Sequence, residues 1–173
     1  ALSNKYEIKT LALYNHMNTY GWLDNIDKNI KKKIEIVSGD IKDYKFINNS
    51  IKNSNYVINL AALIGIPYSY DASQSYIDTN ILGTHNILNA CLENSVEKII
   101  QTSTSEVFGS YASSEKLSEK SFQYAQSPYA ATKIASDQLC NSFYSSYNLP
   151  VVIARPFNTF GPRQSIRAII PTV

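Results

Sequence analysis

The sequence has little of several features that mark whole classes of protein. Its only cysteines, Cys91 and Cys140, lack metal-ligand spacing, so we expect no metal site and no disulfide but two reduced core thiols. Its 16 basic and 14 acidic residues almost cancel, which argues against nucleic-acid and membrane-surface partners. The single basic run, residues 31–33, is interpreted as a solvated helix end.

Long hydrophobic runs are also missing. No apolar stretch approaches the ~20 residues that span a bilayer, and the N-terminus lacks the basic-then-apolar pattern of a signal sequence. We therefore expect a soluble, cytoplasmic protein. The hydrophobic content of 44% suffices for one sizeable core. Because no repeat and no second composition regime appear, the sequence predicts no domain boundary within the chain.

Apolar runs of strand length alternate with segments of helical period. This alternation predicts an α/β fold, a parallel sheet with helices on both faces. Strands are expected over residues 6–14, 34–39, 56–61, 98–103 and 151–155.

Two long helices are predicted between these strands. In residues 74–92, steps of four and three residues mark one buried face, made of Ile77, Ile81, Thr84, Leu88 and Cys91. The second helix should begin after an N-cap at Ser127, with Pro128 in its first turn, and end near Tyr147. Residues 111–126 are Ser-rich and aperiodic, which predicts a loop, and loops of this length are usually functional.

Tyr129 and Lys133 are four residues apart on the second predicted helix. They therefore project from one face, one turn apart, as an acid–base pair would. A neighbouring ammonium favours the phenolate form and so lowers the pKa of a tyrosine. Because such pairs also occur by chance, an exposed helix pair without catalytic function is the alternative.

Residues 99–109 form an apolar strand that runs into hydroxyl groups, a carboxylate and a glycine. Polar groups thus gather at the carboxyl end of a predicted parallel strand, which is where ligands bind in open α/β sheets. A Ser/Thr-capped turn with Glu106 in water is the alternative interpretation.

Six motifs in order carry a family resemblance across essentially the whole chain. They are residues 39–41 (GDI), 60–62 (LAA), 79–84 (TNILGT), 103–109 (STSEVFG), Tyr129-x-x-x-Lys133 and residues 155–162 (RPFNTFGP). Together they resemble the extended short-chain dehydrogenase/reductase family, specifically its nucleotide-sugar 4,6-dehydratases. Residues 14–15, 21–24 and 61–70 are similar to the subgroup that acts on UDP- or GDP-N-acetylglucosamine.

The resemblance implies a Rossmann-like, doubly wound fold that is truncated at both ends. Residues 1–173 would be a partial NAD-binding domain without the N-terminal Gly-rich βα unit and without the C-terminal substrate domain. At Tyr14 and Asn15 no Arg is present to accept a 2′-phosphate, so NAD is favoured over NADP. The family also implies a homodimer in which helices 74–92 and 127–147 pair as a four-helix bundle.

Residue roles follow from the same resemblance. The implied catalytic residues are Thr104, Glu106, Tyr129 and Lys133. The implied cofactor-binding residues are Asp40, Ile41, Leu60, Ala61, Ala62, Asn80, Thr102, Tyr129, Lys133 and Pro156. The implied nucleotide-sugar contacts are Ile64, Thr104, Ser105, Glu106, Asn158 and Arg163.

The implied reaction is transient oxidation of the sugar at C4 followed by loss of water across C5 and C6. dTDP-glucose dehydratases carry Asp at the position of Ser105, whereas GDP-mannose dehydratases have Ser-Glu there, as this chain does. Glu106 would therefore serve as both base and acid. A 4-epimerase and a UDP-glucuronate-type decarboxylase are alternatives within this chemistry. A non-catalytic NAD-binding module is the alternative from another class.

Overall fold

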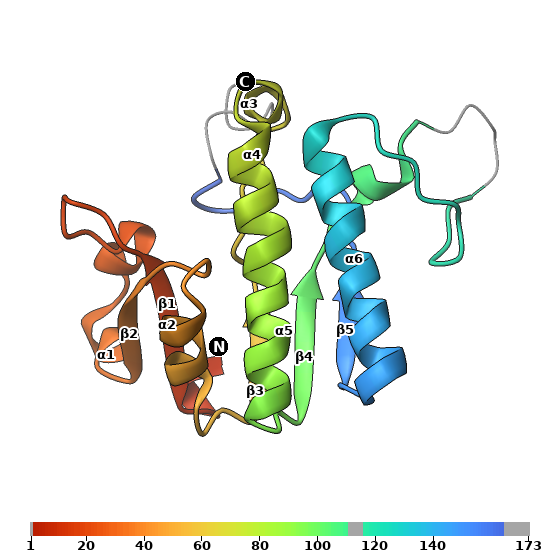
Figure 1. Cartoon of the computed structure of the whole chain (residues 1–173). Helices are drawn as coiled ribbons and strands as arrows, with labels where there is room; N and C mark the ends of the chain where they lie inside the picture. The colour runs from red at the N-terminus through yellow and green to blue at the C-terminus, as the bar shows by residue number, and fades with distance from the viewer. Residues whose placement is uncertain (1, 111–115, 165–173) are drawn as a thin grey trace. The chain divides into compact units, whose positions relative to one another are not determined.

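The computed structural model describes residues 2–110 and 116–164, and the chain divides into two compact units (Figure 1). Unit 1 comprises Ala1–Asp40 and Asn158–Val173, and unit 2 comprises Ile41–Phe157. Each unit has its own parallel sheet, with order β1-β2 in unit 1 and β3-β4-β5 in unit 2. This division is not visible in the composition, which is uniform along the chain.

Unit 1 is built on two strands. Strands β1 (Ile8–Leu13) and β2 (Ile34–Gly39) pair in parallel with Ile8 opposite Ile34, and α1 (Lys28–Lys31) immediately precedes β2. The prediction for β2 is confirmed at both ends, whereas β1 is shorter than predicted at each end. None of the described side chains of this unit is buried.

Unit 2 contains the remaining strands, which are β3 (Tyr56–Asn59), β4 (Lys98–Thr102) and β5 (Val151–Ala154). All pairs are parallel, and Asn59, Gln101 and Ile153 lie in register across the sheet. Each predicted strand is confirmed but ends one or two residues early, because the chain leaves the ladder there to form the loops of the carboxyl edge.

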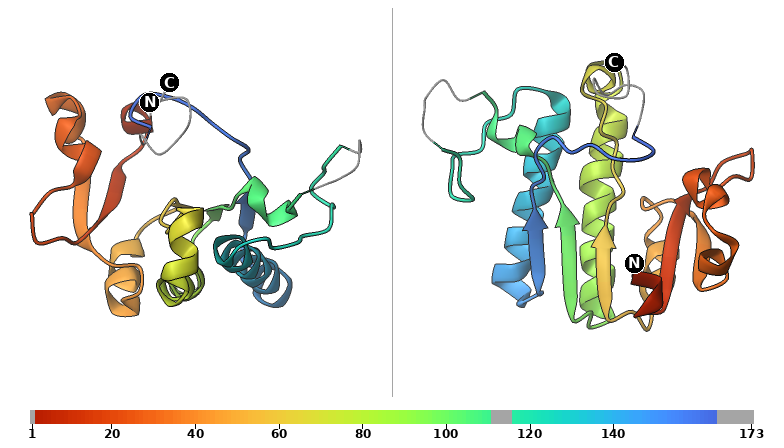
Figure 2. Two further views of the ribbon diagram at one scale, coloured as in Figure 1. Left: turned by 90° about the horizontal axis from the view of Figure 1, so that it is seen from above. Right: turned by 180° about the vertical axis from the view of Figure 1, so that it is seen from behind.

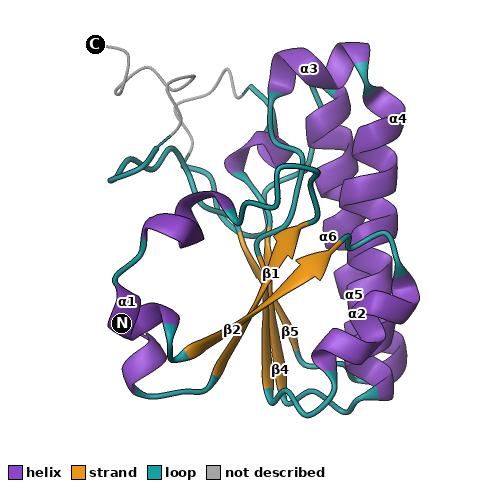
Figure 3. Cartoon of the chain, turned by 90° about the vertical axis from the view of Figure 1, so that its left-hand side faces the viewer, coloured by secondary structure: helices purple, strands orange, loops and turns teal. Residues whose placement is uncertain are grey.

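The helices of unit 2 are α2 (Tyr44–Ile51), α3 (Ile66–Asp71), α4 (Ser73–Tyr76), a π-helical segment (Ile77–Leu82), α5 (Gly83–Glu93) and α6 (Pro128–Tyr147). Helices α5 and α6 lie side by side along one face of β3, β4 and β5 (Figures 1 and 3). Seen from behind, the strands of this unit lie in front of the helices (Figure 2). Parallel strands with flanking helices confirm the predicted α/β class.

The predicted helix over residues 74–92 is confirmed in extent but not in regularity. Its middle is π-helical, and the wider turn rotates the residues before it relative to α5. Thr84, Leu88 and Cys91 are buried as predicted, but Ile77 is 43% exposed. Tyr76 occupies a buried position in its place, so the predicted face is wrong at its N-terminal end.

A buried amide ladder joins β3, β4 and α5. The Asn59 side chain donates to Gln101 Oε1 (2.8 Å), and Gln101 Nε2 donates to Thr84 Oγ1 (3.4 Å). The Asn59 oxygen accepts a hydrogen bond from the backbone N–H of Ala61 (3.0 Å). Because buried amides without partners are costly, this ladder fixes the strand register and the direction of the loop after β3.

A buried ion pair fastens α6 to β5. Asp137 is fully buried and accepts from Arg155 Nε (2.8 Å) and from Gln123 Nε2 (3.2 Å). The Arg155 guanidinium also lies 5.5 Å from the centre of the Phe108 ring. Residues 116–126 contain neither helix nor strand, as predicted, and 111–115 lie outside the described residues. No described helix has the length and apolar character to cross a membrane.

Candidate active site

Residues 102–108 form a tight turn at the carboxyl end of β4. Thr104 caps the single 3₁₀ turn Ser105–Phe108, and its hydroxyl accepts from the backbone N–H of Glu106 (3.2 Å). The N–H of Ser105 donates to the carbonyl of Pro156 (3.0 Å), so the segment after β5 supports the turn. The predicted polar cluster thus lies at the edge of the sheet where ligands bind.

Gly109 ends this turn in a conformation that side chains rarely adopt, with φ of 67°. A Cβ atom at this position would lie 2.6 Å from the carbonyl oxygen of Tyr124. The Tyr124 N–H in turn donates to the carbonyl of Val107 (2.9 Å). Glycine is therefore required where the loop before α6 docks against the turn that carries Glu106.

The start of α6 holds the second part of the predicted site. The Ser127 hydroxyl accepts from the N–H of Ala130 (3.0 Å), and Pro128 is the first helical residue, which confirms the predicted cap. One turn apart, Tyr129 is 6% exposed and Lys133 is 3% exposed. Their burial disfavours the alternative of an exposed helix pair.

The structure brings Thr104, Glu106 and Tyr129 together. Burial raises the pKa of Tyr129, a hydrogen bond with the Thr104 side chain lowers it, and the Glu106 charge raises it further. The net direction is upward, opposite to the shift expected from Lys133. The reason is that burial outweighs the other influences on the phenol.

The Lys133 ammonium points back to the strand. It donates to the backbone carbonyl of Thr102 (2.6 Å), which joins α6 to the carboxyl end of β4. Burial lowers the pKa of Lys133, and the nearby Asp137 carboxylate acts in the opposite direction. Lys133 and Thr102 are therefore adjacent, and their contacts with a cofactor stay predictions.

The loop after β3 presents a second group of predicted residues. Leu60 is 75% exposed and Ile64 is 69% exposed, whereas Ala61 and Ala62 are half-buried. Asn80, predicted to contact the cofactor, is 1% exposed, and its side chain bonds to both backbone groups of Leu63 and to Thr132. These contacts make Asn80 a support of the loop.

Other predicted residues are separated from this cluster in the sequence. Ile41 is buried in unit 2, and Pro156 is exposed after β5. Asp40, Asn158 and Arg163 belong to unit 1, where Asn158 and Arg163 are exposed. The roles predicted for these five residues stay predictions.

Sequence reasoning missed the residues that support the cluster. Tyr76 packs edge-on against Tyr129, and Asp137 pairs with Arg155 beside Lys133. The signal for Asp137 was its spacing, because a residue four positions after Lys133 shares the buried face of α6. No sequence signal marked Tyr76, because the π-helical turn determines its direction.

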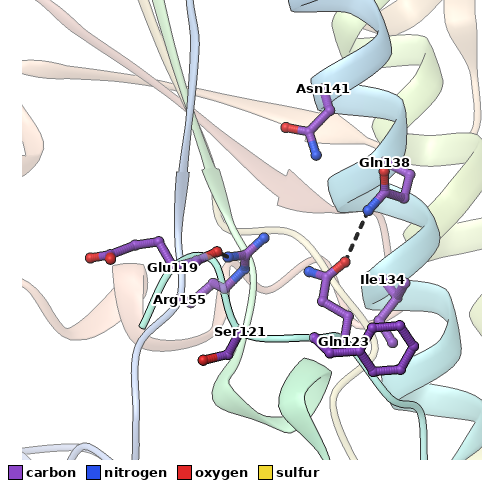
Figure 4. A pocket seen from close by; sticks show the side chains of 8 residues that line it. Glu119, Ser121, Gln123, Ile134, Gln138, Asn141 and Arg155 are labelled. Atoms are coloured by element: carbon purple, nitrogen blue, oxygen red, sulfur yellow. Dashed lines mark hydrogen bonds between the residues drawn. The ribbon is translucent and has the colours of Figure 1, made fainter. Parts of the chain in front are cut away.

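A pocket of about 380 Å³ lies beside α6 (Figure 4), and none of the four predicted catalytic residues lines it. Its lining includes Glu119, Phe122, Gln123, Ile134, Gln138 and Arg155. Gln138 donates to Gln123 Oε1 (2.9 Å), which closes one wall with an amide pair (Figure 4).

The parallel sheets and the buried tyrosine–lysine pair define a Rossmann-like short-chain dehydrogenase/reductase. The chain belongs to the GDP-mannose 4,6 dehydratase family, whose sequence model matches residues 1–173. This confirms the predicted membership in the family of nucleotide-sugar dehydratases and epimerases.

Individual relatives agree with this membership. A dTDP-D-glucose 4,6-dehydratase of Dictyostelium discoideum is 30% identical, over 98% of this chain and 42% of its own length. A double mutant of the dTDP-glucose 4,6-dehydratase DesIV of Streptomyces venezuelae, solved with NAD bound, has a TM-score of 0.85 at 26% identity, over 96% of this chain and 52% of that one.

A UDP-N-acetylglucosamine 4-epimerase of Methanobrevibacter ruminantium, solved with UDP-N-acetylmuramic acid, also has a TM-score of 0.85, at 29% identity. That match covers 97% of this chain and 52% of the epimerase. The chain spans about half the length of the relatives it matches.

Proposed function

We propose that this chain is the larger part of the NAD-binding domain of a nucleotide-sugar 4,6-dehydratase. The observation that carries the proposal is the cluster of Thr104, Glu106 and Tyr129 at the carboxyl end of β4. An acid–base group for C4 and a separate carboxylate for C5 and C6 are what this reaction requires. The family membership and the dehydratase relatives support the same conclusion.

The residues at the carboxyl edge of unit 2 suit NAD. The exposed apolar side chains of Leu60 and Ile64 suit flat rings, and Lys133 beside Thr102 offers a cation for ribose hydroxyls. When bound, NAD would take a hydride from sugar C4 and return it at C6. Ile41, Ala61 and Ala62 would line its path, with Asp40 at the adenosine.

Tyr129 would act on the sugar 4-hydroxyl. Thr104 would hold that hydroxyl, and the Tyr129 phenolate would remove its proton during oxidation. Because burial raises the pKa of Tyr129, the phenol by itself is protonated at neutral pH. A positive charge at Lys133 is therefore needed to favour the phenolate form, which is the role predicted for this residue from the sequence.

Glu106 would perform the elimination. A ketone at C4 acidifies the C5 proton, which the Glu106 carboxylate would remove. The same proton would then go to the departing 6-hydroxyl, so that one water leaves and the carboxylate is regenerated. Ser105 carries no carboxylate, so a single residue must serve both steps, as a half-buried Glu106 at the end of β4 permits.

The identity of the substrate rests on the resemblance. Ser105-Glu106 is typical of GDP-mannose dehydratases, in agreement with the family match, and residues 61–70 favour a UDP- or GDP-N-acetylglucosamine substrate. Ile64 and Ser105 would contact the sugar, and Asn158 and Arg163 its phosphates. A 4-epimerase is the second candidate, because an epimerase structure matches with a TM-score of 0.85.

We also propose a cytoplasmic homodimer. Apolar side chains are exposed along the two helices that the resemblance assigns to a four-helix bundle, with Leu82 45% and Tyr144 60% exposed. The free, buried thiols of Cys91 and Cys140 are compatible with a reducing compartment.

Two substitutions in the complete protein test the activity. With NAD and a panel of nucleotide sugars, mass spectrometry should detect loss of one water from one substrate. Tyr129→Phe should reduce turnover by roughly 10²- to 10⁴-fold because the acid–base group is lost. Tyr56→Phe, at an exposed residue at the amino end of β3, is the matched control and should retain activity.

Glu106→Gln separates the two candidate functions. A dehydratase loses its product entirely, whereas a 4-epimerase keeps producing a sugar of unchanged mass and altered configuration. The exposed Glu119→Gln is its control. Absence of turnover of every sugar by the wild-type protein would contradict the enzyme proposal and favour an NAD-binding module.

A further inference from the structure

Tyr76, the last residue of α4, lies between two parts of the candidate site. It is 1% exposed, and its hydroxyl donates to the carbonyl of Gly65 (2.6 Å), the residue that caps α3. Its ring packs edge-on against Tyr129, with centroids 6.3 Å apart and planes at 79°. One buried side chain thus contacts both the loop after β3 and the phenol at the start of α6.

Asn80, one turn later, makes a second connection between the same two parts. Its side chain accepts from Leu63 N (2.9 Å) and donates to Leu63 O (3.0 Å) and to Thr132 Oγ1 (3.0 Å). The Ser136 hydroxyl donates to the Asn80 carbonyl (2.7 Å). Residues 63–65 are therefore tied to α6 at two points, both through the helix that contains the π-helical turn.

We propose that Tyr76 is a positioning residue, which holds the Tyr129 phenol in its reactive placement and links it to the conformation of the loop Leu63–Gly65. This inference rests on the proposed function. Edge-to-face packing favours one orientation of the two rings, and the bond to Gly65 fixes the other end of Tyr76. A shift of the loop is therefore transmitted to the ring that contacts the acid–base residue.

The loop is the part of the site that would sense a sugar. Ile64, between the two anchored residues, is 69% exposed at the carboxyl end of β3. Leu63 and Gly65 on either side have their backbone groups bonded to Asn80 and Tyr76. Contact at Ile64 thus acts on a segment whose movement requires breaking three partly buried hydrogen bonds.

Tyr76→Phe in the complete protein tests the linkage with the least disturbance. It keeps the ring against Tyr129 and removes the hydroxyl that donates to the Gly65 carbonyl. We expect kcat to fall on the order of 10- to 100-fold, because small misplacements of reacting groups have effects of this size. The KM for the sugar should change less than kcat. Tyr44→Phe, which removes a hydroxyl bonded to Glu93 elsewhere in unit 2, is the matched control and should keep wild-type kcat.

Thr132→Val is a second variant of nearly the same shape, which removes the acceptor for Asn80 and also the hydroxyl that donates to the Tyr129 carbonyl (2.8 Å). It should produce a smaller decrease in kcat in the same direction. A merely structural role of Tyr76 would lower the unfolding free energy without altering kcat per folded molecule or its pH profile. Wild-type kcat and an unaltered pH profile in Tyr76→Phe would overturn the proposal.

A readout without turnover separates this inference from the proposed function. The phenol of Tyr129 can be titrated by NMR with ring-labelled tyrosine, and exchange of the Leu63 amide can be followed in the same samples. Tyr76→Phe should alter both signals, and Tyr44→Phe neither. If the wild-type protein turns over no sugar, the proposed function fails while this pair of signals still decides the role of Tyr76. Unchanged signals would overturn it.

Discussion

Units 1 and 2 both contain parallel strands but differ in what those strands bury. β1 and β2 pair over six residues, the longest ladder among the described residues, yet no described side chain of unit 1 is buried. The ladders of unit 2 are four residues long, and three residues of its strands, Asn59, Ile99 and Gln101, are buried. Two paired strands are marginal without a packed face, so ladder length and core burial contribute separately to stability.

The largest expected effect comes from a matched pair of substitutions, each of which shortens one leucine side chain to alanine. Leu88→Ala removes a fully buried side chain from α5 and should lower the unfolding free energy of unit 2 by about 2–5 kcal/mol. Leu11→Ala, in the half-buried middle of β1, should cost less than about 1.5 kcal/mol. Urea unfolding with segment-resolved hydrogen exchange measures both, and equal losses would contradict the comparison.

Alkaline pH should act on unit 2 through its buried thiols. Burial raises the pKa of Cys91 and of Cys140 to about 12. Below pH 9 both the folded and the unfolded chain hold these protons, and above it only the unfolded chain releases them, so stability falls as pH rises. At pH 10 we expect a loss of about 1.4 kcal/mol for each thiol.

The control for the thiols is the double variant Cys91→Ala and Cys140→Ala, whose unfolding free energy should change little between pH 8 and 10. If the variant kept the wild-type dependence of unfolding free energy on pH, the thiols would be excluded as the cause.

The stability of unit 1 should depend on acidic rather than alkaline pH. A hydrogen bond from Thr19 is the main cause of the lowered pKa of Asp24, and its contribution is lost as pH falls through that lowered value.

The smallest expected difference concerns helix caps. Ser127→Ala removes the N-cap of the 20-residue helix α6 and should lower the unfolding free energy of unit 2 by about 1 kcal/mol. Asp27→Ala removes the corresponding cap of α1, which is four residues long, so its effect should stay within that turn. Amide exchange in the first turn of each helix distinguishes the two, and a global effect of Asp27→Ala would contradict the comparison.

Strands and helix starts were predictable because their signals are local. Apolar runs identified all five strands, and the Ser127-Pro128 pair identified the start of α6. The turn at Thr104 was recognisable as polar residues after an apolar strand. Its meeting with Tyr129, which lies on helix α6, was implied by the family resemblance and not by the strand pattern.

Contacts between distant segments were not predictable from local patterns. The division after Asp40 depends on packing and leaves no mark in composition. Two features depend on where α6 docks. The Lys133 ammonium points toward Thr102, and burial outweighs charge in setting the pKa of Tyr129. The exposure of Ile77 depends on a backbone irregularity that side-chain periodicity cannot reveal.

The π-helical segment also bears on how the chain tolerates changes in length. A π-helical turn holds more residues than an α-helical one, so deleting one residue from Ile77–Leu82 would leave a regular α-helix. Each α-helical residue turns by about 100°, so the part of the helix before the deletion would rotate by roughly that angle relative to α5. Tyr76 would then face away from Tyr129. A deletion that improves local helix geometry would therefore disable the site, so the site depends on the number of residues in this helix.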